Sequence, residues 1–462
     1  MREKLGSRLG FILLSAGCAI GIGNVWKFPY MAGQYGGGIF VLFYIFFLII
    51  MGVPVLSMEF AMGRASQKSP VKMYRELEPE KSKWHLHGYF ALGGNYLLMM
   101  FYTCVSGWML SYFVSTLTGS LSGLDAAGVE TFFNEQVLSN APSMILFTFI
   151  TIILGFTVCS FSLQKGLERI TKVMMLALLG IMIVLAVNSI FLDGGIEGLK
   201  FYLMPNLESV RALGGGNLVK GFLTVIAGAM NQAFFTLSLG IGSMAVFGSY
   251  LNKDRSLLGE AVNVSVLDTF VAITSGLIIF PACFAYGVSP DSGPSLIFIT
   301  LPNIFNNLPL GRLWGSLFFV FMSFAALSTV FAVFENIIAC TMDQFKFSRK
   351  RACLINCILM LVLCLPCIFG FNVLSGFTPF GPGTNILDLE DFIVSNILLP
   401  LGSLIFVIFC TCRYGWGFSK YKEEANQGKG LKVKNRMKPY LTFVLPVMIF
   451  IIFIFGLYNF FK

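Results

Sequence analysis

The first long apolar run of the chain is interrupted at residues 16–24, which read Ala-Gly-Cys-Ala-Ile-Gly-Ile-Gly-Asn. A second interruption, at residues 234–242, reads Phe-Phe-Thr-Leu-Ser-Leu-Gly-Ile-Gly. Each glycine lowers the stability of a helix by roughly 1 kcal/mol relative to alanine. In lipid an unpaired backbone group costs several kcal/mol, so a broken helix is tolerated only where it is buried or lines a cavity. Two such interruptions favour paired broken helices around a central binding site over glycines that only allow close helix packing.

The composition places these interruptions in a membrane protein. Of the 462 residues, 56% are hydrophobic and 12% are charged, against roughly a quarter charged in an average soluble domain. This apolar surface is more than one aqueous core can bury, so lipid must serve as part of the solvent. The two histidines, His85 and His87, offer neither a zinc cluster nor a buried base for most hydrolases. The chain is therefore predicted not to be an enzyme.

The apolar stretches predict eleven transmembrane helices, because crossing the ~30 Å hydrocarbon layer takes about 20 residues. The predicted spans are 8–33, 37–62, 88–117, 141–160, 167–191, 217–250, 257–287, 313–342, 352–371, 390–412 and 439–461. The sixth and eighth are too long for a straight crossing, which predicts tilt, breakage or extension beyond the bilayer. No segment has the composition of a soluble domain, so residues 1–462 are predicted to form a single transmembrane domain.

The positive charges predict the orientation. Most of the 32 lysines and arginines fall in alternate connections, on the side that also holds the N-terminus. The positive-inside rule then predicts a cytoplasmic N-terminus and, after eleven crossings, an external C-terminus. These connections account for the net charge of +9, so no nucleic-acid partner is expected. The outer connection at 289–301 is compatible with short helices that return toward the bundle or with an ordinary surface loop.

Eight short motifs identify a family resemblance. They are Arg8-Leu-Gly-Phe, Gly21-Ile-Gly-Asn-Val-Trp-Lys-Phe-Pro29, Gly36-Gly-Gly38, Glu59-Phe-Ala-Met-Gly-Arg64, Lys165-Gly-Leu-Glu-Arg169, Gln232-Ala-Phe-Phe-Thr-Leu-Ser238, Ala325-Ala-Leu-Ser-Thr329 and Asp391. Together they resemble the neurotransmitter:sodium symporter family, most closely its prokaryotic amino-acid transporters. The resemblance implies the LeuT-type fold, an all-α membrane protein with two inverted five-helix repeats, here 1–192 and 217–412. Helices 1 and 6 would be broken, and 439–461 would be an additional helix 11.

The resemblance also implies a function. It predicts sodium-coupled symport of a neutral, hydrophobic or aromatic L-amino acid by alternating access, in a multi-pass protein of the inner (plasma) membrane. The expected partners are the amino-acid substrate and the lipid bilayer, and a monomer and a homodimer are both compatible with the sequence. Two alternatives remain open: a sodium-coupled carrier of another small zwitterion or amine, and a non-transporting amino-acid receptor or channel on the same scaffold.

The binding residues are implied by position within the motifs. Substrate contacts would come from Ala19, Ile22, Gly23, Leu98, Tyr102, Phe235, Thr236, Ser238, Ile241, Thr329, Ala332 and Val333. The first of two sodium sites would use Ala19, Asn24, Thr236 and Asp268 together with the substrate carboxylate. The second would use Gly17, Ile20, Ala325, Ser328 and Thr329. For the two hydroxyl residues, hydrogen bonding to the preceding helical turn is the simpler alternative.

Charged residues inside or beside the spans supply the expected gates. Lys27 and Asp391 match an outer ion pair above Tyr102 and Phe235, and Arg2 and Asp343 match an inner pair. The competing interpretations are plain positive-inside topology for the inner arginine and a helix-capping surface acid for the outer aspartate. Each pair would bias the protein toward closure on its own side.

Three further acids lie at membrane depth. Asp268 stands where many relatives have asparagine, and Ala272 lacks the acid that replaces chloride in some prokaryotic members. Chloride is therefore expected not to be required, with Asp268 carrying the negative charge. Glu59 is interpreted as support for an unwound backbone. For Glu335, pairing, protonation and a water-filled inner vestibule are all left open.

Overall fold

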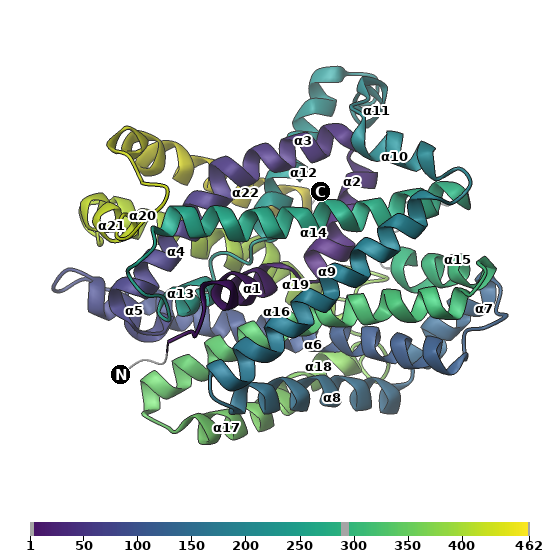
Figure 1. Cartoon of the computed structure of the whole chain (residues 1–462), viewed down its shortest axis with the longest axis horizontal. Helices are drawn as coiled ribbons and strands as arrows, with labels where there is room; N and C mark the ends of the chain where they lie inside the picture. The colour runs from purple at the N-terminus through teal and green to yellow at the C-terminus, as the bar shows by residue number, and fades with distance from the viewer. Residues whose placement is uncertain (1–3, 288–294, 461–462) are drawn as a thin grey trace.

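The computed structural model describes residues 4–287 and 295–460, which form one helical bundle (Figure 1). Ten of its helices are long and apolar enough to cross a membrane, and one bent pair supplies an eleventh span. No β-strand forms in these two ranges, where β-pairing is limited to the isolated bridges Gly37–Pro205 and Arg255–Lys429. The prediction of an all-helical membrane protein with eleven spans is confirmed.

The α-helices follow one another closely along the chain. They are α1 (Arg8–Ala19), α2 (Phe28–Gln34), α3 (Gly38–Phe47), α4 (Val53–Ser66), α5 (Pro70–Leu77), α6 (Leu86–Thr118), α7 (Ala126–Thr131), α8 (Ala141–Ser160), α9 (Arg169–Ile190), α10 (Gly195–Leu203) and α11 (Leu207–Leu213). The remainder are α12 (Leu218–Phe235), α13 (Ser243–Gly248), α14 (Leu257–Ala285), α15 (Leu301–Asn307), α16 (Gly311–Phe345), α17 (Arg349–Leu363), α18 (Leu365–Phe369), α19 (Ile386–Phe392), α20 (Leu399–Thr411), α21 (Phe418–Ala425) and α22 (Leu445–Phe460). Short π-helical segments join several of them, as at Gly23–Lys27 and Leu296–Thr300.

The first span breaks where the sequence predicts. α1 begins at Arg8, after the cap residue Ser7, whose side chain accepts a hydrogen bond from the Gly10 amide, and it ends at Ala19. The helix resumes at Gly23 after a bend of 59°. Because the glycines disfavour a continuous helix at this point, the local sequence is sufficient to explain the break.

The sixth span is also broken, between α12 and α13. Residues 236–242 are not helical, and Ser238, Gly240 and Gly242 have φ of 50°, 97° and 75°. A Cβ on Gly240 would lie 2.3 Å from the Leu399 carbonyl oxygen. Glycine is therefore required there both by backbone conformation and by close packing. This second break confirms the predicted pair.

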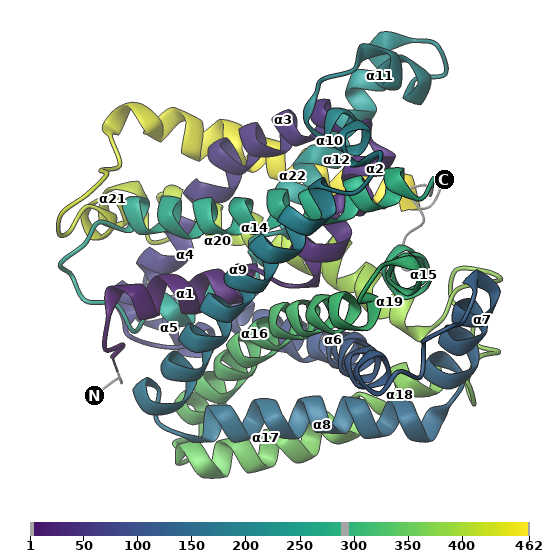
Figure 2. The same cartoon turned by 45° about the vertical axis from the view of Figure 1, so that its right-hand side comes forward.

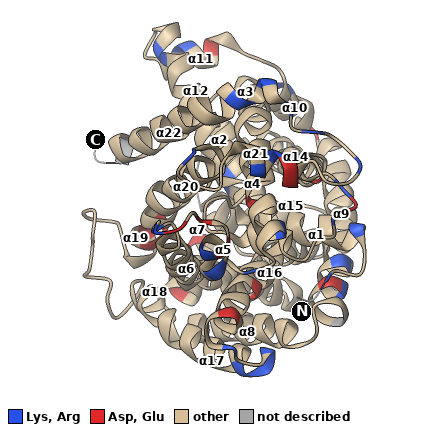
Figure 3. Ribbon diagram, turned by 90° about the vertical axis from the view of Figure 1, so that its left-hand side faces the viewer, with Lys and Arg blue, Asp and Glu red and all other residues tan. Residues whose placement is uncertain are grey.

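The two breaks lie inside the bundle. α1 packs against α9, α14 and α16, and α6 runs along α16. At the edge of the molecule α8 and α17 lie side by side (Figure 2). Each candidate span contains an 18-residue stretch with at most two charged residues, and in a view from one side of the bundle the charged residues are short segments on mostly uncharged ribbons (Figure 3).

The two ends of the bundle carry different short elements. The N-terminus, α5 and α21 lie at one end, and α7 and α15 lie at the other (Figures 1 and 2). The outer connection predicted at 289–301 contains a π-helical turn, Leu296–Thr300, that leads into α15. There the Phe298 ring stacks on Phe133 with 5.0 Å between centroids. The described part of this connection is thus folded back onto the bundle, and residues 288–294 lie outside the described ranges.

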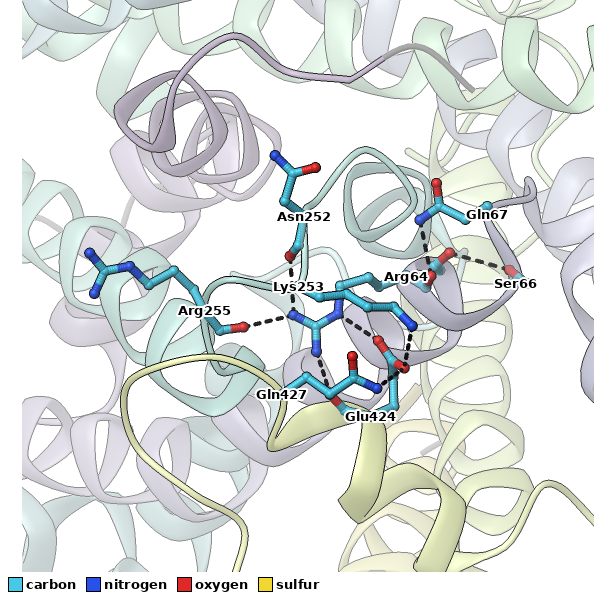
Figure 4. A network of polar contacts seen from close by, with 9 residues as sticks. Arg64, Ser66, Gln67, Asn252, Lys253, Arg255, Glu424 and Gln427 are labelled. Carbon is cyan, nitrogen blue, oxygen red and sulfur yellow. Dashed lines mark hydrogen bonds and ion pairs between the residues drawn. The ribbon is translucent and has the colours of Figure 1, made fainter. Parts of the chain in front are cut away.

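A buried arginine fastens α21 to α4 (Figure 4). Arg64 is 1% exposed, and its Nε lies 2.6 Å from Glu424 Oε1. The same guanidinium donates to the carbonyls of Asn252 and Arg255, at 3.3 and 2.7 Å, and to the Glu424 carbonyl. One side chain therefore joins the end of α4 to α21 and to the connection between α13 and α14, both distant in the sequence.

Candidate functional site

A cavity of about 490 Å³ reaches the broken first span from the end of the bundle that carries α7 and α15. Its lining is Ile22, Gly23, Trp26, Lys27, Tyr30, Phe101, Tyr102, Val105, Trp108, Phe133, Leu138, Phe235, Ser295, Phe371, Asn385, Leu387, Asp388 and Asp391. The lining is mostly apolar and aromatic, with the two acids and one lysine near one another. Such a cavity suits an apolar ligand that also carries a few polar groups.

Side chains satisfy backbone groups at the first break. The Tyr102 hydroxyl accepts from the Ile22 amide at 3.1 Å. Gln232 Nε2 donates to the Gly23 carbonyl at 3.1 Å, and Ser238 Oγ donates to the Cys18 carbonyl at 3.3 Å. These bonds explain how an irregular backbone is tolerated in the middle of the bundle.

Glu59 supports the second break as predicted. Its Oε1 accepts a hydrogen bond from the Gly240 amide at 2.6 Å, and the side chain is fully buried. The carboxylate thereby fixes the non-helical backbone between α12 and α13.

Three of the four residues predicted for the first sodium site contact one another through their side chains. Asn24 Nδ2 lies 2.8 Å from Asp268 Oδ1 and 3.0 Å from Thr236 Oγ1, and the threonine hydroxyl lies 3.0 Å from Asp268 Oδ2. Tyr44 adds a hydroxyl 3.4 Å from Asp268 Oδ2. Ala19, the fourth residue, is the last residue of α1. The cluster concentrates oxygen donors and one carboxylate at the break.

The five residues predicted for the second sodium site also converge. Ser328 Oγ lies 3.1 Å from the Ile20 carbonyl and 2.8 Å from that of Ala325. Thr329 Oγ1 lies 3.4 Å from the Gly17 carbonyl and 3.3 Å from that of Ile20. Ser328 makes both a bond to its own helix and a bond across to α1, so back-bonding is only part of its role.

The chemistry of both clusters fits a monovalent cation. The second cluster consists of neutral carbonyl and hydroxyl oxygens. In the first cluster the Asp268 carboxylate and the Thr236 hydroxyl face Asn24 Nδ2, while the Asn24 oxygen accepts from the Gly21 amide at 3.3 Å. Hard oxygen donors with little charge suit sodium better than a divalent ion. Within residues 4–287 and 295–460 no three His, Cys, Asp or Glu side chains converge as metal ligands.

The predicted substrate residues fall into two groups. Ile22, Gly23, Tyr102 and Phe235 line the cavity. The others lie deeper or at the breaks: Ala19, Leu98, Thr236, Ser238, Ile241, Thr329, Ala332 and Val333. Of these, Ile241, Ala332 and Val333 are fully buried. In this conformation the cavity therefore stops at the aromatic level, above the apolar residues predicted to hold the ligand side chain.

The outer gate residues share the cavity but not an ion pair. Lys27 Nζ lies 3.6 Å from the centroid of the Phe235 ring. Asp391 accepts from Ser395 Oγ at 2.6 Å. Among the described contacts, no nitrogen–oxygen distance of 4.0 Å or less joins the lysine and the aspartate. The predicted pair is therefore open here, and the ammonium rests on an aromatic face instead.

The structure also places the predicted inner-gate aspartate and the buried acid Glu335. Arg2 lies outside the described residues, and its predicted partner Asp343 accepts from the Ser69 amide at 2.6 Å. Glu335, which the sequence left open, is paired: its two oxygens lie 2.7 and 2.8 Å from the Arg349 guanidinium. The Tyr250 hydroxyl donates to the same carboxylate at 2.6 Å.

Sequence reasoning missed a set of buried polar residues that lie next to the buried substrate residues Leu98, Ile241 and Val333. They are Asn95, Ser243 and Asn336, each fully buried and hydrogen-bonded to the others. Two of them are asparagines inside predicted spans, where such side chains hydrogen-bond between helices. Their position about one helical turn from the predicted pocket residues Leu98 and Val333 was the available signal.

Comparison with known proteins covers the whole chain. The model of the sodium:neurotransmitter symporter family matches residues 2–140 and 140–462. The sodium-dependent transporter YhdH of Bacillus subtilis is 34% identical over 450 residues, which are 97% of this chain and 96% of the relative. A sodium-dependent transporter of Haemophilus influenzae is 30% identical over 99% of this chain and 98% of its own length.

A solved structure gives the same result. The crystal structure of MhsT in complex with L-phenylalanine superposes with a TM-score of 0.86 at 36% sequence identity. The match covers 99% of this chain and 100% of that one. The likeness therefore extends over nearly the full length of both chains.

Proposed function

Because the chain belongs to the sodium:neurotransmitter symporter family, we propose that it carries a neutral, hydrophobic or aromatic L-amino acid into the cell, driven by sodium. The observation that carries the proposal is the direct contact of Asn24, Thr236 and Asp268 at the junction of the two breaks. The apolar lining of the adjoining cavity supports a hydrophobic substrate. The phenylalanine named with the MhsT structure points the same way.

The substrate would bind by its two charged groups at the first break. The carboxylate would accept hydrogen bonds from the amides of Ile22 and Gly23 and from the Tyr102 hydroxyl. Without substrate, the Ile22 amide donates to the Tyr102 hydroxyl, so the carboxylate would replace the tyrosine as its acceptor. The amine would face carbonyls of Ala19, Phe235 and Thr236, with Ser238 nearby. The side chain would enter among Leu98, Phe235, Ile241, Ala332 and Val333. Amides at a helix start and freed carbonyls are suited to these opposite charges.

Coupling to sodium follows from shared ligands. The first cluster would hold one ion through Ala19, Asn24, Thr236 and Asp268, and the substrate carboxylate would complete that site. The second cluster, with Thr329 and Ser328 on α16, would hold another ion against α1. When bound, sodium supplies positive charge beside the substrate carboxylate. Since the carboxylate is also an ion ligand, the two bindings strengthen each other reciprocally.

Alternating access would use the gates on either side of this site. Approach of Lys27 and Asp391 would close the outer cavity, and Arg2 with Asp343 would close the inner side. The protein would lie in the inner (plasma) membrane, with the N-terminal end of α1 toward the cytoplasm, as the lysine and arginine distribution favours. Charged gates at this depth require a water-filled vestibule, and the cavity of about 490 Å³ has room for one on one side.

The experiment that tests the proposal is binding of a panel of labelled amino acids to the purified protein in sodium and in potassium. One hydrophobic or aromatic amino acid should bind in sodium and not in potassium. Sodium-dependent binding of another zwitterion or an amine instead would establish the alternative carrier. Binding without sodium dependence would favour a receptor and would overturn the coupling. Uptake into proteoliposomes under a sodium gradient then separates transport from binding.

Thr329→Ala is expected to raise the sodium concentration needed for half-maximal substrate binding about tenfold. The change removes a hydroxyl that faces the carbonyls of Gly17 and Ile20, and a factor of ten corresponds to about 1.4 kcal/mol. The measurement is a sodium titration of substrate binding. Thr274→Ala is the matched control, because within residues 4–287 and 295–460 that buried threonine hydrogen-bonds only to its own helix, at the Phe270 carbonyl. An unchanged sodium response would remove Thr329 from the site.

Asp268→Asn is expected to convert chloride-independent uptake into weak, chloride-stimulated uptake. The fully buried Asp268 carboxylate is the negative charge that offsets a cation at the first cluster, and chloride would have to replace it in the variant. The measurement compares uptake by proteoliposomes in chloride and in gluconate for both proteins. A native protein that requires chloride would contradict the assignment.

A further inference from the structure

A fully buried polar network joins three helices just beyond the second break. Its members are Asn95 on α6, Ser243 at the start of α13 and Asn336 on α16, each 0% exposed. Asn336 Nδ2 lies 2.9 Å from Asn95 Oδ1 and 3.2 Å from Ser243 Oγ. Ser243 Oγ in turn donates to Asn95 Oδ1 at 3.2 Å. Each polar side chain thus has partners in both other helices.

The same two asparagines hold a backbone group that the break sets free. The Ile241 carbonyl accepts from Asn95 Nδ2 at 2.9 Å and from Asn336 Nδ2 at 3.2 Å. Ile241 lies in the non-helical stretch before α13 and is fully buried. A buried carbonyl without a helical partner needs such donors, and here they come from two other helices.

The network lies on the far side of the proposed ligand pocket from the cavity. Along α6, Tyr102 and Val105 line the cavity, and Asn95 comes before Leu98, about one helical turn away. Along α16, Asn336 comes about one turn after Val333. The asparagines therefore form the layer beneath the apolar residues Leu98 and Val333, between the pocket and the opposite end of the bundle.

α13 is bonded to α16 at both ends. Asn336 holds its start, and the Tyr250 hydroxyl just after its end donates to Glu335 at 2.6 Å. Between these ends α13 packs against α4, where a Cβ on Gly63 would lie 1.8 Å from the Ala245 carbonyl oxygen. α13 and α4 are thus in backbone contact, while its links to α6 and α16 run through side chains that can separate.

We propose that Asn95 and Asn336 are positioning residues that latch the start of α13 against α6 and α16, closing the substrate pocket on its inner side. The proposal rests on the proposed transport function. Release of substrate to the inside then requires the Ile241 carbonyl and Ser243 to leave both asparagines. Amide groups suit this role because water entering from the inner side can replace each of their hydrogen bonds. Water cannot replace an apolar contact at the same place in this way.

The first test is hydrogen–deuterium exchange of the full-length protein in lipid nanodiscs, with Asn336→Leu compared with the native chain. Leucine keeps similar bulk and removes the donor to Asn95, Ile241 and Ser243. Amides of residues 236–250 are expected to exchange at least tenfold faster, in sodium and in potassium. Unchanged exchange in this segment would overturn the proposal.

Asn356→Leu is the matched control. Asn356 is 1% exposed and donates to Thr341 Oγ1 on α16 at 3.0 Å, and its side-chain oxygen accepts from Tyr96 on α6. It therefore links α6, α16 and α17 without a described hydrogen bond to α13. The control is expected to leave exchange at 236–250 within twofold of native. Equal acceleration in the two variants would show general loosening and would overturn the latch.

The second readout is the substrate. Asn336→Leu is expected to raise the half-saturating substrate concentration about tenfold while maximal uptake stays within twofold, since the closed pocket is less populated but the ligand groups remain. A loss of maximal uptake with unchanged half-saturation would contradict a positioning role. Hydrogen–deuterium exchange is measured without added amino acid. A protein that binds no amino acid would therefore contradict the proposed function, while the exchange rates of residues 236–250 would still test the latch.

Discussion

Gly21→Ala is expected to lower sodium-dependent substrate binding at least a hundredfold. A Cβ at this position would lie 2.4 Å from the Tyr102 hydroxyl and 2.5 Å from Thr329 Oγ1. Both oxygens would have to move, and they belong to the proposed carboxylate site and to the proposed second sodium site. Loss of two such contacts corresponds to about a hundredfold, at roughly 1.4 kcal/mol for each factor of ten. The measurement is equilibrium binding of the labelled amino acid found in the panel.

Gly93→Ala is the control for this change. Gly93 lies in α6, the same helix as Tyr102, and a Cβ there would meet nothing within 4 Å. Binding by this variant should match the native protein. Native-like binding by Gly21→Ala would mean that the close approach of α1, α6 and α16 at this point has no part in ligand recognition.

Arg64→Leu is expected to lower the free energy of unfolding by about 3 kcal/mol, because the Glu424 carboxylate loses its buried guanidinium partner and keeps the mostly exposed Lys253 ammonium, 3.7 Å away. The carbonyls of Asn252 and Arg255 lose a donor at the same time (Figure 4). The measurement is thermal unfolding of the purified variant followed by tryptophan fluorescence. The double variant Arg64→Leu with Glu424→Leu should recover part of the loss, since no charge is then stranded.

A second ion pair provides the contrast. Lys253 Nζ lies 3.7 Å from Oε2 of the same Glu424, but the lysine side chain is 60% exposed. Lys253→Leu leaves Arg64 on the carboxylate and should therefore change stability by less than about 1 kcal/mol. If the Lys253 and Arg64 variants melted alike, burial of the Arg64 network would not be the source of its contribution.

Much of the fold could be predicted from local patterns. Apolar runs of sufficient length predicted eleven spans, and glycine clusters at 16–24 and 234–242 predicted both breaks, because helix length and glycine content act over a few neighbouring residues. The motifs also named residues that do converge, among them Asn24, Thr236 and Asp268. Whether those residues bind sodium remains a prediction.

Contacts between residues that are distant in the sequence were harder to predict. The sequence offered Lys27 an acid, Asp391, but the structure places the lysine on the Phe235 ring. It gave Glu335 no partner, and the structure brings Arg349 to it from the next helix. Several partners of the right charge exist for each group, and only the crossing of the helices selects among them.

The sequence by itself determined that this is a membrane protein, that its chain crosses the membrane about eleven times, and where the first and sixth spans break. Those properties follow from hydrophobicity and backbone preferences that each segment carries alone. The tertiary structure decided which freed carbonyls meet which side chains, as when Asn95 and Asn336 converge on Ile241. The physical reason is that a buried hydrogen bond depends on two groups reaching the same point, and segments far apart in sequence reach it only when the whole bundle has packed.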